Sequence, residues 1–246
     1  MGTHSDRWIG ADHWVSASNS ELNLARIMDT SDVCVVGIDG GGLDDLLGLG
    51  VIGRHRETRD WQHWGKAWAD HDVKENRPQI AEALADFERE GDLVFCDNGV
   101  DDIAEVAEIC KELNLAGVLP DEHAIGLDPE GVAAIVDALI AAEITDEQMS
   151  AITQGYRLNS AIKGTPRKLK AGSLIHCGQP LMAWCVGNAK TENKGNAQVV
   201  TKAISGASKI DPLMGLFNAV MLMSRNPQPT MRANLDDFLS NPVMAL

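Results

Sequence analysis

Residues 33–39 have the sequence VCVVGID, a short run of β-branched and other apolar residues that ends in an acid. A run of this kind is typical of a buried central strand. Three glycines at 40–42 then predict a turn, and residues 46–55 predict a second strand. Residues 61–68 carry three tryptophans at a spacing that suits a helix as well as a strand. We expect a strand, because it completes an antiparallel meander.

Downstream of the meander, short apolar runs alternate with amphipathic stretches. Proline in the first turn marks several helix starts, as at Pro78, Pro129 and Pro212. We expect strands at 91–95, 123–127 and 198–203, helices at 76–89, 101–113, 130–142, 181–188 and 212–223, and a partly helical basic stretch at 155–171. This order predicts an α/β fold, a mixed sheet in which an antiparallel meander is followed by parallel strands, flanked by helices on both faces.

Length and composition suit one large domain. The chain has 246 residues, 44% of them apolar, so a sizeable core can form. We expect a linker at 1–31, whose first seven residues could come from an expression tag, a globular domain at 32–225 and a loosely ordered tail at 226–246. No stretch reaches the roughly 20 apolar residues that span a bilayer, and the N-terminus lacks the apolar run of a secretion signal.

Cysteine usage and charge narrow the class of protein. The five cysteines include no Cys-x-x-Cys pair, which indicates reduced thiols in the cytoplasm and neither a zinc site nor a disulfide framework. The net charge of -15 argues against a protein that binds nucleic acid through a broad basic surface. It leaves open an enzyme that gathers carboxylates around metal ions and confines its basic residues to one strip.

Three acids share one kind of position. Asp39 ends the first strand, Asp128 ends a later strand, and Asp211 begins the last long helix. Carboxylates at adjacent strand ends and a helix N-terminus can converge at one edge of a sheet, where their mutual repulsion requires cations. Oxygen ligands favour Mg²⁺ or Mn²⁺, and two such ions about 3.5–4 Å apart suit phosphodiester hydrolysis. Alternatively, Asp128 and Asp211, each followed by proline, are helix caps.

The same segments resemble a known family. Residues 37–46, GIDGGGLDDL, look like the first-strand motif of the large terminase subunits of tailed phages, in which an acid closes the strand and a second acid follows about six residues later. Residues 125–129, IGLDP, are similar to that family's second acidic strand, and 209–212, KIDP, to its closing motif. Blocks at 154–158, 174–176 and 180–188 follow the family's order, so that the resemblance covers about residues 8–225.

The resemblance implies a ribonuclease H-like nuclease domain of a phage or prophage packaging terminase, acting in the cytoplasm of a bacterial host cell. It matches Asp39, Asp128 and Asp211 to the metal-binding triad and Asp45 to an accessory acid. It implies that concatemeric double-stranded DNA is cut with two Mg²⁺ or Mn²⁺ ions, and that the partners are DNA, the small terminase subunit and the portal, with no membrane. The Gly-x-x-x-x-Gly-Lys-Ser/Thr motif of the family's ATPase is missing, which implies an isolated C-terminal domain.

The sequence departs from the family pattern in three places. Glycines stand at 40–42, where relatives usually carry small hydroxyl residues. Asp44 lies beside Asp45, so the position of the accessory acid is open by one residue. Asp97, which also ends an extended run, competes with Asp128 for the second metal position; Asp128 is favoured because it precedes a helix and matches the Asp-Pro motif.

Basic residues concentrate in one stretch of this acidic chain. A strip of this kind could bind backbone phosphates without reading sequence, although a solvated surface is the alternative. His176 could position a water molecule, but a buried, hydrogen-bonded histidine is the simpler interpretation. The predicted DNA-binding residues are Arg157, Lys163, Arg167, Lys168, Lys170, Lys202 and Lys209.

Two other classes of protein remain in view. Sugar-kinase and actin-like nucleotide-binding proteins also open with Gly-Ile-Asp-Gly-Gly-Gly, but here residues 43–45 add negative charge where a phosphate would lie, and no second copy of the motif follows. A non-catalytic docking domain of a packaging motor that keeps the nuclease fold is the other alternative.

Overall fold

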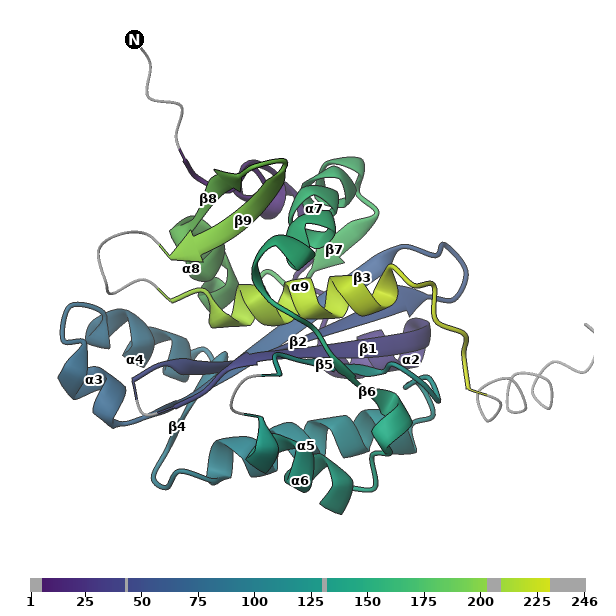
Figure 1. Ribbon diagram of the computed structural model, residues 1–246, viewed down its shortest axis with the longest axis horizontal. Helices are drawn as coiled ribbons and strands as arrows, with labels where there is room; N and C mark the ends of the chain where they lie inside the picture. The colour runs from purple at the N-terminus through teal and green to yellow at the C-terminus, as the bar shows by residue number, and fades with distance from the viewer. Residues whose placement is uncertain (1–5, 43, 130–131, 203–208, 231–246) are drawn as a thin grey trace, which may run out of the picture.

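A three-stranded antiparallel meander forms the centre of the main sheet in the computed structural model, which describes residues 6–42, 44–129, 132–202 and 209–230 (Figure 1). The strands are β1 (Ser31–Gly40), β2 (Leu46–His55) and β3 (Trp61–Asp70). The sequence prediction of a meander, with the tryptophan-rich segment as its third strand, is therefore confirmed.

Four shorter strands extend the meander with parallel pairs only. They are β4 (Leu93–Cys96), β5 (Ile125–Leu127), β6 (Met149–Ala151) and β7 (Leu174–His176). The sheet order is β4-β3-β2-β1-β5-β6, and β7 shares the outer edge of β3 with β4. Between these two partners the Gln179 side chain replaces a strand: its amide accepts from the Gly65 N–H at 2.8 Å and donates to the Gly65 carbonyl at 2.6 Å.

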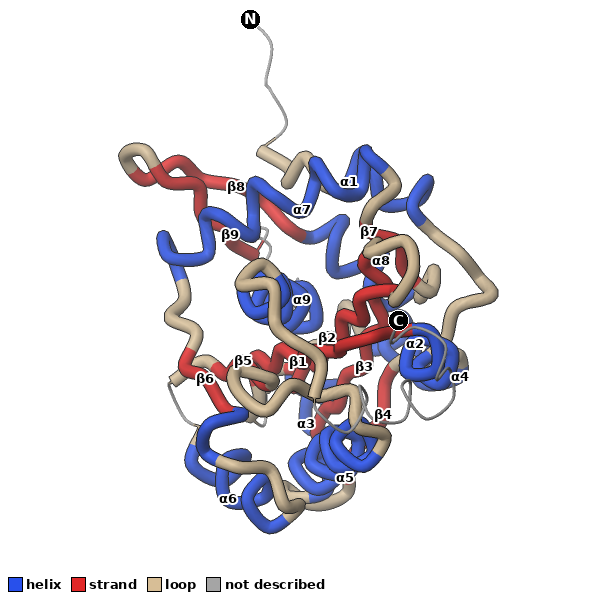
Figure 2. The backbone as a smooth tube through the Cα atoms, turned by 90° about the vertical axis from the view of Figure 1, so that its right-hand side faces the viewer, coloured by secondary structure: helices blue, strands red, loops and turns tan. Residues whose placement is uncertain are grey.

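Helices cover both faces of the sheet (Figures 1 and 2). On one face, the last helix, α9, lies across β1 and β2, between the sheet and the layer formed by α7 and α8. Helices α5 and α6 cover the other face. The helices are α1 (Ala11–Trp14), α2 (Leu24–Thr30), α3 (Asp72–Asn76), α4 (Ala81–Arg89), α5 (Asp101–Leu115), α6 (Ala133–Ala141), α7 (Asn159–Ala171), α8 (Pro180–Asn188) and α9 (Asp211–Met223), with 3₁₀ turns at Val15–Ala17, Asp146–Gln148 and Gly155–Leu158. The expected mixed sheet flanked by helices is confirmed.

Glycines allow α9 to lie directly on the strand backbones. Gly37 and Gly50 pair across β1 and β2, and Gly48 follows on the same face. A Cβ added at Gly37 would lie 2.0 Å from the carbonyl oxygen of Gly215, and one at Gly48 would lie 2.4 Å from the Pro212 nitrogen. Because no side chain fits at these positions, the start of α9 is fixed beside the end of β1 and the start of β2.

Several elements differ from the sequence prediction. The predicted strand at 198–203 does not join the main sheet; it is β9 (Ala197–Lys202), paired in a separate hairpin with β8 (Ala189–Lys194), and residue 203 lies outside the described residues. The polar sequence of β8 and the three-residue lengths of β6 and β7 left no periodic pattern to detect. The prediction of one helix at 76–89 with Pro78 in its first turn is wrong: Asn76 ends α3, Pro78 lies in a turn, and α4 begins at Ala81. Proline disfavours the helical conformation of the residue before it, which separates the two helices.

The N-terminal segment packs onto the domain instead of extending from it. Trp8 is fully buried, with its ring edge-on to Phe217 of α9 at a centroid distance of 5.3 Å. Its indole N–H donates to the carbonyl of Ile162 at 3.0 Å. That carbonyl would normally accept from residue 166, which is proline and has no N–H. The boundary expected after residue 31 stays a prediction, as does the one after residue 225. Among the described helices, none has the length and hydropathy needed to cross a membrane.

Candidate metal and DNA site

Asp39 and Asp128 lie at the ends of neighbouring parallel strands. Ile38 of β1 is paired with Leu127 of β5, and each acid is the next residue along its chain. Both acids line one pocket of about 220 Å³ at the edge of the sheet, together with Gly40, Val132 and, from α6, Ile135. The sequence prediction that these two strand ends are adjacent is therefore matched by the geometry.

Asp211 reaches the same edge from α9. Asp39 lies directly opposite Gly48 in the antiparallel pair, so the two residues face the same side of the sheet. A Cβ at Gly48 would lie 2.6 Å from the backbone carbonyl carbon of Asp211, and one at Gly40 would lie 3.0 Å from the Asp211 Cβ. Asp211 is 4% exposed. The buried first turn of α9 thus brings the third acid next to the end of β1.

The acids do not form a closed cluster. Within the described part of the chain, no three His, Cys, Asp or Glu side chains are arranged so that they could hold a metal ion as they stand. The alternative of helix caps fits Asp128 poorly, because α6 begins five residues later, at Ala133. For Asp211, which is the first residue of α9, the N-cap is Ile210.

Gln154 is a residue of this site that the sequence analysis did not single out. Its side-chain amide donates to Asp39 Oδ1 at 2.7 Å. It follows β6, the strand next to β5, and Gly155 after it has a φ of +73°, which turns the chain into the next 3₁₀ helix. Its only sequence signal was its place in a block that resembles the terminase family. On the helix side, Asn218 of α9 donates to the carbonyl of Ile38 at 2.8 Å and anchors the strand immediately before Asp39.

Asp97, the competing candidate for the second metal position, lies elsewhere. It follows β4, which is separated from β1 by two strands. Its side chain is 92% exposed and pairs with His71 at 3.2 Å. The adjacency to Asp39 therefore favours Asp128.

Asp45 and Asp44 lie on the other side of the glycine turn and are held by basic residues. Lys209 contacts Asp45 Oδ1 at 2.9 Å and also donates to the backbone carbonyl of Asp44. Arg77 binds the Asp44 carboxylate through two nitrogens at 2.5 and 3.1 Å, and this hydrogen bond is the main cause that lowers the pKa of Asp44 below its usual value. Each of the two acids has a basic partner, so which of them matches the family's accessory acid stays open.

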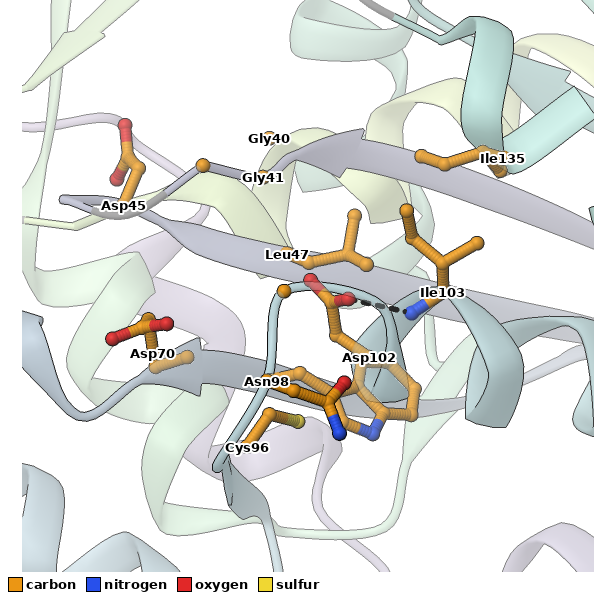
Figure 3. Close-up of a pocket in the computed structure, with 14 residues that line it drawn as sticks. Gly40, Gly41, Asp45, Leu47, Asp70, Cys96, Asn98, Asp102, Ile103 and Ile135 are labelled. Atoms are coloured by element: carbon orange, nitrogen blue, oxygen red, sulfur yellow. Dashed lines mark hydrogen bonds between the residues drawn. The ribbon is translucent and has the colours of Figure 1, made fainter.

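A second pocket, of about 290 Å³, opens on the α5 side of the sheet (Figure 3). Asp45, Asp70 and Asp102 lie around it, and Asp102 accepts from the backbone N–H of Ile103 at 2.7 Å. Gly40 and Gly41 line both pockets, so the pocket beside Asp45 adjoins the one that Asp39 lines.

The predicted DNA-binding residues have different surroundings. Lys163, Arg167 and Lys170 are exposed along one face of α7, and Arg157 is exposed just before the helix. Lys168 is half-buried with its ammonium 3.8 Å from the centre of the Trp61 ring, and burial lowers its pKa. Only the backbone of Lys202, at the end of β9, lies within the described residues.

Lys209 does not belong to the exposed strip. Its side chain is 4% exposed and forms the ion pair with Asp45. A DNA contact by Lys209 stays a prediction, and it would require that this pair be broken.

His176 and the cysteines follow the structural interpretations. His176 is 2% exposed, and its Nδ1 accepts from the Gly178 N–H at 3.1 Å. Its Nε2 lies 2.7 Å from the carbonyl oxygen of Trp14, and its ring stacks on the Trp14 ring. None of the five cysteines forms a disulfide bond in the described part of the chain, and Cys177 is the one cysteine that is not buried. Burial raises the pKa of Cys34 and Cys110 to about 12.

Comparisons with known proteins show that this fold is similar to that of solved large terminases. No protein-family model matches the chain. Protein YmfN of Escherichia coli (strain K12) is 25% identical over 221 residues, which cover 84% of this chain and 46% of the relative, so the chain spans about half the length of the curated relative it matches. The large terminase of bacteriophage HK97 superposes with a TM-score of 0.70 at 18% identity, over 87% of this chain and 43% of that one. The large terminase nuclease of the thermophilic phage G20c gives a TM-score of 0.53 at 14% identity, over 88% and 98% of the two chains. The chain therefore has the ribonuclease H-like fold of large terminase nuclease domains.

Proposed function

We propose that the chain is a metal-dependent endonuclease domain of a DNA-packaging terminase, which hydrolyses double-stranded DNA with little sequence preference. The observation that carries the proposal is the convergence of Asp39, Asp128 and Asp211 from two strand ends and a helix start at one edge of the sheet. The similarity to solved terminase nucleases supports it at the level of the fold.

The donor set fits a hard divalent cation. The acids at this edge offer carboxylate oxygens, and the described residues beside them in the pocket are glycines and apolar residues, with no cysteine or histidine. Asp39, Asp128 and Asp211 would hold the two ions, Mg²⁺ or Mn²⁺. Bound divalent ions supply a water nucleophile at neutral pH and stabilise charge on the phosphate.

The other residues of the site position these acids. Gln154 holds Asp39 Oδ1, and Asn218 fixes the backbone immediately before it. The glycine contacts hold the first turn of α9 against β1 and β2, so the position of Asp211 depends on the sheet backbone. The backbone positions of the acids are therefore fixed by packed elements, and only their side chains would have to turn to bind an ion.

DNA would be held by the exposed basic face of α7. Lys163, Arg167 and Lys170 lie on α7. The 3₁₀ turn that contains Arg157 comes directly before this helix, and Gln154, which contacts Asp39, comes directly before that turn. This path links the basic face to the acids within one segment of chain. In a complete packaging motor we expect the small terminase subunit and the portal as further partners.

The test is cleavage of plasmid DNA in Mn²⁺ and in EDTA. Asp39→Asn, Asp128→Asn and Asp211→Asn should each reduce the cleavage rate by at least about 10²-fold, because each removes one charged oxygen ligand. Unfolding of the metal-free variants, followed by circular dichroism, should show an equal or higher Tm, since like charges at one site repel. Asp97→Asn is the matched control and should cleave like the wild type.

The outcomes separate the rival classes of function. Cleavage that persists in EDTA, or in all three variants at the acids, would contradict the proposal. Mn²⁺ binding without cleavage at any salt concentration would favour a docking domain. A thermal shift with ATP but none with Mn²⁺ would favour a nucleotide-binding protein.

A further inference from the structure

Lys209 is a buried cation two residues before Asp211. Its side chain is 4% exposed, and its ammonium contacts Asp45 Oδ1 at 2.9 Å and the carbonyl of Asp44. Its own backbone carbonyl accepts from the Asn188 side chain at 3.2 Å. The ion pair thus connects the glycine turn after β1 with the start of α9, the two segments that carry Asp39 and Asp211.

A buried ammonium is costly unless it is paired. Removing a lysine from water costs several kcal/mol, which a close carboxylate and further hydrogen bonds offset. Here the pair is nearly closed to solvent on the lysine side, so added salt screens it little. Asp45 is therefore held by Lys209 in this structure, beside a pocket that shares Gly40 and Gly41 with the pocket that Asp39 lines.

We propose that Lys209 is an internal counter-ion that competes with the divalent metal for Asp45. The inference rests on the proposed function, because it concerns the metal site formed by Asp39, Asp128 and Asp211. Lys209 acts through Asp45 and is a positioning residue: while the pair is closed, Asp45 Oδ1 is bound to the ammonium instead of to a metal ion. Opening of the pair releases a fourth carboxylate near the site and removes a positive charge from its border.

The experiment measures Mn²⁺ binding by calorimetry, without DNA, on the wild type, Lys209→Gln, Asp45→Asn and the double variant. Glutamine keeps a donor for the carbonyl of Asp44 but carries no charge. Lys209→Gln should lower the Kd for Mn²⁺ by about tenfold when Asp45 is present, because a nearby unit charge is removed and the carboxylate is released. In the Asp45→Asn background the same substitution should change the Kd by about threefold or less.

Two further variants complete the design. Lys209→Arg keeps the charge and should bind Mn²⁺ like the wild type. Lys209→Met, with similar length and no charge, replaces Lys209→Gln if the glutamine variant does not fold, as judged by circular dichroism.

The outcomes are distinct. An equal change of Kd in both backgrounds would mean that Lys209 only repels the metal through space, and would overturn the competition for Asp45 alone. An unchanged or higher Kd in Lys209→Gln would also overturn it. A wild type that binds no Mn²⁺ would overturn the proposed function, and this inference with it.

Discussion

Gly48 shows how one residue without a side chain determines the position of a candidate catalytic acid. It lies opposite Asp39 in the meander, and a Cβ there would lie 2.4 Å from the Pro212 nitrogen and 2.6 Å from the carbonyl carbon of Asp211. Real Cβ atoms do not approach backbone this closely, so a larger residue would push the first turn of α9 away from the strands. The same position therefore affects both stability and the geometry of the acids.

Gly48→Ala should lower the free energy of unfolding by about 1–3 kcal/mol, the usual cost of overpacking. It should also reduce Mn²⁺-dependent cleavage, because Asp211 moves with its helix. Urea unfolding and the plasmid assay measure the two effects. Gly164→Ala is the matched control: Gly164 lies inside α7 with nothing within 4 Å of an added Cβ, so the change should stabilise the protein by roughly 0.5–1 kcal/mol. A Gly48→Ala variant of unchanged stability would contradict the proposed close packing.

Helix α7 continues through a residue that usually interrupts helices. Pro166 lies inside it and cannot donate to the carbonyl of Ile162. The indole of Trp8 donates to this carbonyl instead, from a segment that lies 154 residues earlier in the chain. The glycine and proline in this stretch predicted an interrupted helix, and a tertiary contact compensates for the proline.

The exposed face of α7 carries the prediction for DNA binding. A variant with Lys163, Arg167 and Lys170 changed to alanine should bind DNA more weakly, and the slope of log K against log salt concentration should fall in magnitude by roughly 0.9 for each lost phosphate contact. Fluorescence anisotropy with a labelled duplex at several salt concentrations measures this. Changing Lys111 of α5, on the opposite face of the sheet, to alanine provides the control, which should leave the slope unchanged. An unchanged slope in the triple variant would indicate that this face is only solvated.

Over the whole molecule, buried histidines join the N-terminal segment to the sheet. His63 of β3 is 1% exposed, contacts the carbonyl of Val51 at 3.0 Å and lies beside Trp14 and His176. Burial lowers the pKa of His63 to about 3, and burial also lowers the pKa of His176. Both imidazoles are therefore neutral in the folded chain, and their protonation favours unfolding.

Stability should consequently decrease in mild acid. Well above pH 6.5, His63 is neutral in both the folded and the unfolded chain, so its titration does not lower the free energy of unfolding. Below pH 6.5 the unfolded chain binds a proton at this histidine, whereas the folded chain binds it only near pH 3. This group alone should lower the free energy of unfolding by about 1–2 kcal/mol between pH 6.5 and 5. Urea unfolding at both pH values measures the change. His63→Asn keeps a donor for Val51 and should reduce the pH dependence, whereas His123→Asn, on the surface, should not. An equal slope in His63→Asn would assign the acid sensitivity to other groups.

The local sequence was sufficient for the meander, most of the longer helices and the acids at their ends. The VCVVGID run, the helical periodicity and the proline at the start of α9 are signals between residues close in the chain, and the structure retains them. Pro78 and Pro129, which also predicted helix starts, lie before the first residues of α4 and α6. Asp39, Asp128 and Asp211 could be chosen because a strand or helix end is a local feature. The family resemblance supplied their grouping before any distance was known.

Contacts between distant residues were beyond the reach of that analysis. The pairing of β1 with β5 brings Asp128, and not Asp97, next to Asp39. The amide of Gln154 contacts Asp39 across 115 positions of the chain, and Lys209 contacts Asp45 across 164. Short strands such as β6 and β7 gain their stability from their neighbours and show no periodicity of their own. Burial of Lys209 likewise depends on packing, because a charge in the sequence carries no information about which carboxylate will compensate it.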